Sequence, residues 1–140
     1  MLRNVSLKGV IIGAVFDVVG TNIWIFAVVG YLIIKHQLYA LPSSDQQTSE
    51  LHRLYADPAV RVVNAAVGIG FSIVGGYLAA RIAGHHERLN GALSSFLCVA
   101  FTLFTIGSIS IGWVIEGVVG SPLLGLLGGY LRLWQTRTKI

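Results

Sequence analysis

Charged side chains are scarce in this chain of 140 residues, because Asp, Glu, Lys and Arg make up only 11% of it and hydrophobic residues make up 54%. Soluble domains carry about 25% charged residues. So few charges cannot cover a water-soluble surface, which argues against an ordinary soluble domain. Ten Lys and Arg against six Asp and Glu leave a net charge of +4. In a membrane protein this balance is typical of cytoplasmic loops and of contact with anionic lipid, so we expect no nucleic-acid partner.

Residues that carry chemistry are equally few. The single cysteine, Cys98, lies within an apolar segment, which excludes an intrachain disulfide and a cysteine metal cluster. No histidine lies in an apolar stretch of membrane length, which argues against a bis-histidine haem. The sequence has no phosphate-binding loop, metalloprotease helix or nucleophile elbow. We therefore expect no enzymatic activity, no metal and no cofactor, while a bound lipid or pigment is compatible with the sequence.

The few charges divide the chain into apolar blocks of membrane length. About 20 apolar residues cross the hydrocarbon core of a bilayer as a helix. The blocks predict four spans, at about residues 9–34, 60–80, 89–110 and 113–133. The first block is too long for a cleaved leader, so we expect it to be an anchor. The sequence thus predicts an all-α, polytopic membrane protein whose single domain, residues 1–140, is a bundle of four transmembrane helices.

The fourth predicted span contains Pro122, and two interpretations of it stay open. A helix that begins near Trp113 and kinks around Pro122 would cross fully, because neighbouring helices make such a kink tolerable in lipid. The alternative is a re-entrant turn followed by a half-helix that Ser121 caps. We favour the kinked helix because residues 122–133 alone are too few to cross.

Lys and Arg are unequally distributed between the predicted loops. Seven lie at the N-terminus, in the loop between the second and third spans, or in the C-terminal tail: Arg3, Lys8, Arg81, Arg88, Arg132, Arg137 and Lys139. Three lie on the opposite side: Lys35, Arg53 and Arg61. Because positively charged loops stay on the cytoplasmic side, both termini are predicted to be cytoplasmic.

The predicted external loop, residues 36–59, is the one substantial polar segment. Residues 41–45 (Leu-Pro-Ser-Ser-Asp) are typical of a turn that leads into a helix N-cap. Three apolar side chains follow at helical spacing: Leu51, Leu54 and Tyr55. We therefore predict a short amphipathic helix on the outer membrane surface, ended by Asp57 and Pro58.

Small residues recur at every fourth position around a repeated motif, Gly-Gly-Tyr-Leu, at residues 75–78 and 128–131. One row lies in the second span: Gly68, Ser72, Gly76, Ala80 and Gly84. The other lies in the fourth: Gly117, Ser121, Gly125 and Gly129. Lipid offers no hydrophobic drive for helices to associate, so they are held by close backbone approach over small side chains. We interpret the rows as helix-packing surfaces and the repeat as a duplicated helical hairpin.

Asp17 is the one ionisable residue predicted near the middle of the bilayer, about 13 Å into the first span. An unpaired carboxylate is costly there, so we expect it to be protonated, hydrogen-bonded or facing water. Its candidate partners are polar residues at similar depth: Thr21, Asn22, Ser72 and Ser94. Two further polar residues, Asn64 and Glu116, are predicted near the outer ends of the second and fourth spans, either lining a shallow vestibule or solvated at the interface.

The segment Gly-Gly-Tyr-Leu-Ala-Ala-Arg-Ile-Ala-Gly-His-His-Glu-Arg-Leu-Asn-Gly, residues 75–91, resembles a pattern in small four-helix bacterial inner-membrane proteins of uncharacterised function. The positions most like that pattern are Gly75, Gly76, Tyr77, Ala80, Arg81 and Gly84. The resemblance implies a bacterial inner-membrane location and four spans, and it implies no activity or site.

Abundant helix-packing surface beside so little chemistry predicts a non-catalytic accessory, structural or assembly subunit. Its partners would be the lipid bilayer and either other membrane subunits or further copies of this chain. The alternative is a small oligomeric transporter or channel, with Asp17 in a proton or cation pathway. We favour the packing role because a pathway normally needs several polar groups in series.

Overall fold

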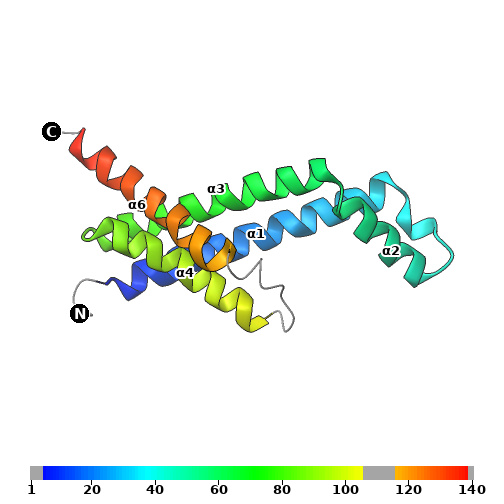
Figure 1. Ribbon diagram of the computed structural model, residues 1–140, viewed down its shortest axis with the longest axis horizontal. Coiled ribbons are helices and arrows are strands. Elements are labelled where there is room, and N and C mark those ends of the chain that lie inside the picture. Colours follow the sequence, from blue (N-terminus) through cyan, green and yellow to red (C-terminus); the bar gives the residue numbers. More distant parts are fainter. Residues whose placement is uncertain (1–4, 106–115, 139–140) are drawn as a thin grey trace. The chain divides into compact units, whose positions relative to one another are not determined.

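The computed structural model describes residues 5–105 and 116–138 (Figure 1). Within these residues the chain is entirely helical and has no strand, which confirms the predicted all-α class. Its five α-helices are α1 (Leu7–Lys35), α2 (Ser44–Tyr55), α3 (Pro58–Ala83), α4 (Glu87–Thr105) and α6 (Ser121–Arg137). Two short turns precede α2 and α6: the 3-10 turn η2 (Leu38–Ala40) and the π-helical turn η3 (Glu116–Gly120).

The chain forms two compact units, and the predicted single domain over residues 1–140 stays a prediction. Unit 1 contains residues 1–19 and 69–140, and unit 2 contains residues 20–68. The first part of α1, the last part of α3, α4 and α6 therefore belong to unit 1. The remainder of α1 and of α3, together with η2 and α2, belongs to unit 2. Each unit is built around its own helix contacts.

Helices α1 and α3 are the two described helices that are long and apolar enough to cross a membrane, at 29 and 26 residues. They cover the predicted spans 9–34 and 60–80 and extend each by a few residues. Helix α4 begins two residues before the third predicted span, whose end at residue 110 lies outside the described residues. The start of the fourth predicted span, near Trp113, also lies outside them. The described helices thus account for two membrane-length spans, and the fourfold crossing stays a prediction.

Side-chain caps set the helix ends in unit 2. The Ser43 hydroxyl accepts a hydrogen bond of 3.3 Å from the Gln46 amide and so caps α2, as the sequence predicts. The Asp57 carboxylate accepts one of 2.8 Å from the Ala59 amide and so caps α3, whose first residue is Pro58. Most of α2 is exposed, and its predicted apolar face is half-buried: Leu51, Leu54 and Tyr55.

A wide π-helical turn, rather than a capped helix start, precedes Pro122. Gly120 keeps helical angles (φ −68°, ψ −46°) where η3 passes into α6, and no side chain caps α6 there. Ser121 is the first residue of α6 and not its cap, and its hydroxyl donates a hydrogen bond of 3.4 Å to the Ser95 carbonyl of α4. Pro122 is the second residue of α6. Turn η3 ends two residues before Pro122, and the predicted kink of a helix that begins near Trp113 stays a prediction, because Trp113 lies outside the described residues.

The interior of unit 1 is made of small and polar residues. Its largest fully buried side chains are only Asn90, Ser94 and Ser95. Its buried glycines and alanines lie on all four helices: Gly9, Gly13, Ala14, Gly75, Gly76, Ala79, Ala80, Gly91, Gly125, Gly128 and Gly129. Large apolar side chains lie instead on the outer faces, and Phe104, for example, is 96% exposed. The usual distribution of a soluble core is thus reversed.

Candidate functional site

The first part of α1 and the last part of α3 approach so closely that their main chains touch. A Cβ atom added at Gly9 would lie 2.6 Å from the carbonyl oxygen of Ala79, and one added at Gly75 would lie 2.8 Å from the carbonyl oxygen of Gly13. Neither distance leaves room for a side chain. Glycine at these positions therefore sets the spacing between α1 and α3.

Helix α6 packs in the same way on α3 and on α4. Gly125 lies against both Gly76 of α3 and Gly91 of α4. One turn later, a Cβ atom at Gly129 would lie 2.5 Å from the carbonyl oxygen of Glu87. The antiparallel α4 and α6 are thus joined by backbone contact along several turns, as α1 and α3 are.

The residues of the two predicted packing rows have different surroundings. Five are buried in unit 1: Ser72, Gly76, Ala80, Gly125 and Gly129. A Cβ atom at Gly68 would meet nothing within 4 Å. Gly84 follows the last residue of α3 with φ +65°, so it ends the helix and takes no part in the described packing. Gly117 belongs to η3, and its surroundings lie outside the described residues.

The two Gly-Gly-Tyr-Leu copies do not occupy equivalent positions. In the first copy Gly75 packs on α1 and Gly76 packs on α6. In the second copy the order is exchanged, because Gly128 packs on α3 and Gly129 packs on α4. Two hairpins related by an axis would place corresponding glycines against corresponding helices. Both copies of the motif therefore form close helix contacts. The hairpin of α1 and α3 and the hairpin of α4 and α6 do not use them in the same way.

Asp17 is buried at the contact between α1 and α3, with 3% of its surface exposed. The Ser72 hydroxyl donates a hydrogen bond of 2.9 Å to its carboxyl oxygen Oδ2. Cys98 of α4 also interacts with the Asp17 carboxyl. Of the other candidate partners, Ser94 donates to the Gly91 carbonyl in its own helix, and Thr21 and Asn22 follow Asp17 along α1. The polar centre of unit 1 is thus Asp17 with Ser72 and Cys98.

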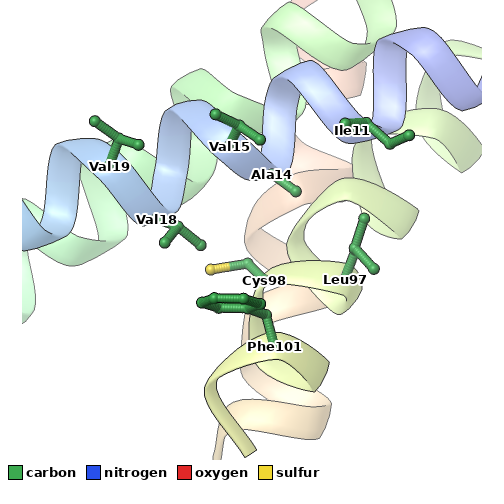
Figure 2. A pocket seen from close by; sticks show the side chains of 8 residues that line it. All are labelled: Ile11, Ala14, Val15, Val18, Val19, Leu97, Cys98 and Phe101. Atoms are coloured by element: carbon green, nitrogen blue, oxygen red, sulfur yellow. The ribbon is translucent and has the colours of Figure 1, made fainter. Parts of the chain in front are cut away.

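An open apolar recess of about 250 Å³ lies between α1 and α4, beside this polar centre. In Figure 2 the Cys98 side chain and the Phe101 ring lie on α4, across from Val18 of α1. The side chains that line the recess are apolar apart from the Cys98 thiol: Ile11, Ala14, Val15, Val18, Val19, Leu97, Cys98 and Phe101. This lining fits a hydrocarbon chain and offers no series of polar groups leading to Asp17.

Asn90 is a buried polar anchor that the sequence reasoning did not single out. Its carboxamide oxygen accepts a hydrogen bond of 2.7 Å from the Ser6 amide at the start of α1. Its amide nitrogen donates to the carbonyl oxygens of His85 and His86, at 2.9 and 3.2 Å. Asn90 therefore ties the start of α1 to the turn between α3 and α4.

Asn64 holds an indole ring in unit 2. The Trp24 indole N–H donates a hydrogen bond of 2.9 Å to the Asn64 carboxamide oxygen, and both residues line an apolar recess of about 290 Å³. The Asn64 amide nitrogen is buried and has no hydrogen-bond partner among the described residues. Glu116 begins η3, and its side chain lies outside the described surroundings. A vestibule that these two residues share therefore stays a prediction.

No group of three or more His, Cys, Asp or Glu in the described part of the chain is arranged to hold a metal ion. No protein-family model, no curated protein and no solved structure matches this chain.

Proposed function

We propose that this chain is an integral membrane protein of the bacterial inner membrane, with four crossings and both termini in the cytoplasm. We propose further that it acts as a non-catalytic accessory, structural or assembly subunit. One observation carries the proposal, namely the reversed distribution of side chains. Asn90, Ser94 and Ser95 are fully buried, whereas Phe26 and Phe104 are 74% and 96% exposed.

This distribution suits a lipid solvent. In water, apolar faces of such extent drive association or aggregation, because contiguous exposed apolar patches on soluble monomers are small. In a bilayer the same faces match the acyl chains, and small residues allow the backbones to pack closely. The outer faces of α1, α3, α4 and α6 are then free to contact lipid, further copies of the chain or other membrane subunits.

The surroundings of Asp17 favour a packing role over transport. Its carboxyl group is buried and accepts the Ser72 hydroxyl, so it joins α1 to α3. Interhelical hydrogen bonds of this kind stabilise membrane bundles by about 0.6–2 kcal/mol each. The recess beside it is lined by apolar side chains, whereas a proton or cation pathway needs polar groups in series.

Membrane extraction and topology mapping test the crossings. Alkaline carbonate should leave the chain in the membrane pellet, and tags at the two ends should both be reached only from the cytoplasmic side. A cysteine introduced at Ser49 of α2 into a Cys98→Ser background should react with an impermeant maleimide from outside. Release by carbonate, or tags on opposite sides, would overturn the proposed topology.

Purification from native membranes in polymer nanodiscs tests the subunit role. We expect the 15.0 kDa chain to elute within a larger assembly, held by the outer faces of its helices. Recovery of free monomers only would overturn this role. Liposome flux tests the alternative function: proton or cation flux that Asp17→Asn abolishes would favour transport, whereas no flux in either protein would favour packing.

A further inference from the structure

Five cationic side chains lie at one end of unit 1, which we call the basic end: Lys8, Arg81, Arg88, Arg132 and Arg137. Packing contacts bring together the four helix ends that carry them. The start of α1 packs on the end of α3 through Gly9 and Ala83, and the end of α6 packs on the start of α4 through Gly129 and Glu87. The hydrogen bond from the Ser6 amide to Asn90 joins the starts of α1 and α4.

The charge of the basic end is not neutralised by its own residues. Glu87 is the one described acidic residue among these helix ends, and none of the five cationic side chains forms an ion pair within residues 5–105 and 116–138. Four of them are exposed, and Arg132 is half-buried. Such a concentration of one charge sign attracts an anionic partner.

Two of these arginines flank the contact between α3 and α6. The Tyr77 hydroxyl donates a hydrogen bond of 2.6 Å to the carboxamide oxygen of Gln135, and Arg132 donates to the same oxygen at 3.4 Å. Arg81 follows Tyr77 by four residues, so the two share one face of α3. Arg81 of α3 and Arg132 of α6 are therefore placed on the same side of the α3 and α6 pair as Gln135.

A third arginine is held in place on the neighbouring helix. The Arg88 guanidinium lies over the Tyr130 ring, with 5.1 Å between its central carbon and the ring centroid. A cation–π contact of this kind keeps the guanidinium near α6 without consuming its N–H donors. The donors of three arginines are thus available around the end of α6.

We propose that the basic end binds the phosphate groups of anionic phospholipids, with Arg81 and Arg132 as the central pair. This inference rests on the proposed membrane function and names a lipid partner for it. Guanidinium groups bind phosphate oxygens through paired N–H donors. The helix faces next to the basic end continue as exposed apolar surface, with Leu131 at 47% and Trp134 at 59% exposure. A phosphate at the arginines therefore leaves its acyl chains against apolar side chains.

Spin-labelled lipids test this inference in reconstituted protein. Electron spin resonance with chain-labelled phosphatidylglycerol and phosphatidylcholine gives the relative association constant of the two lipids. We expect the protein to prefer phosphatidylglycerol. Each of Arg81→Gln and Arg132→Gln should lower that preference by up to about fivefold at low salt, which is the effect of one interfacial cation. The preference should weaken in 1 M salt because charges are then screened within about 3 Å.

Two variants keep the test specific. Arg61→Gln removes an exposed arginine at the other end of α3 and should leave the preference unchanged. The charge-preserving pair Arg81→Lys and Arg132→Lys should retain most of it, which excludes a folding defect as the cause. Equal binding of the two lipids by membrane-embedded wild-type protein would overturn the lipid inference alone, as would an equal loss in Arg61→Gln. Release of the chain by carbonate would instead overturn the proposed membrane function.

Discussion

Replacing single glycines of α3 by alanine separates backbone packing from helix propensity. Gly68 and Gly76 belong to the same row at four-residue spacing in the same helix. A Cβ atom at Gly76 would lie 2.7 Å from the Cα atom of Gly125, whereas one at Gly68 would meet nothing within 4 Å. The two substitutions add the same methyl group, and they differ in what that group meets.

The expected difference follows from these surroundings. Alanine gains about 0.5–1 kcal/mol over glycine inside a helix, and this gain is common to both variants. The added methyl group at Gly76 also forces α3 and α6 apart, and such overpacking costs about 1–3 kcal/mol. We therefore expect Gly68→Ala to match or exceed the wild-type free energy of unfolding, and Gly76→Ala to fall about 1–3 kcal/mol below Gly68→Ala.

Unfolding by sodium dodecyl sulfate in mixed micelles measures this difference, with helicity and tryptophan fluorescence as probes. Both variants should first show the wild-type elution profile, so that their transitions are comparable. Equal unfolding free energies for Gly68→Ala and Gly76→Ala would refute the inference that backbone contact sets the spacing of α3 and α6. Greater destabilisation by Gly68→Ala would refute it as well.

Three further predictions concern polar groups. Ser72→Ala removes a hydrogen-bond donor from the buried Asp17 carboxyl and should lower the unfolding free energy by about 0.6–2 kcal/mol in the same micelle assay; no loss would mean that this bond is not made. Asn90→Ala leaves the half-buried Ser6 amide and two carbonyls without this partner, and hydrogen exchange at the start of α1 should accelerate at least tenfold while α2 is unchanged. The hydrogen bond and charge of Arg53 lower the pKa of Glu50 from its usual 4.5, so the pair's contribution to α2 is complete above that pH and is lost as the pH falls through the lowered value. A nitroxide label on α2 should gain mobility over that acidic range, and Glu50→Gln should abolish this pH dependence.

Helix positions could be predicted because they depend on composition over many residues. The charges at Lys8, Lys35 and Arg81 lie at or near the ends of long apolar blocks, and α1 and α3 follow those blocks closely. The capped starts of α2 and α3 were also predictable, since Ser43 and Asp57 are strong N-cap residues before helical segments.

Contacts between helices could be predicted only in part. The four-residue spacing identifies small residues on one helix face, but it does not predict which neighbouring helix each residue contacts. Gly84 continues the row and yet has φ +65°, because a helix-ending glycine and a packing glycine look alike at that spacing. Ser72 was one of four candidate partners of Asp17, and its hydrogen bond to Asp17 depends on how α3 packs on α1.

Asn90 shows a different limit of sequence reasoning. Asn90 follows within five residues of two histidines and two charged residues, at positions 85–88, and such a polar segment is typical of a solvated turn. Its burial depends on the start of α1 folding over that turn, which is a contact between residues 84 positions apart. The π-helical turn before Pro122 was equally hidden, because one wide turn changes the hydrogen-bond pattern without changing the residue types.

Main-chain atoms set the helix spacing in unit 1. Its outward side chains should therefore tolerate substitution better than its buried glycines and serines. Exposed side chains such as Val15, Phe96 and Leu127 make little of the contact that holds the helices together. These outward residues could be replaced by Glu, Lys and Gln while every buried glycine and serine is kept. The resulting variant should dissolve without detergent. Such a redesigned chain would present the same interior to crystallisation or nuclear magnetic resonance in plain buffer.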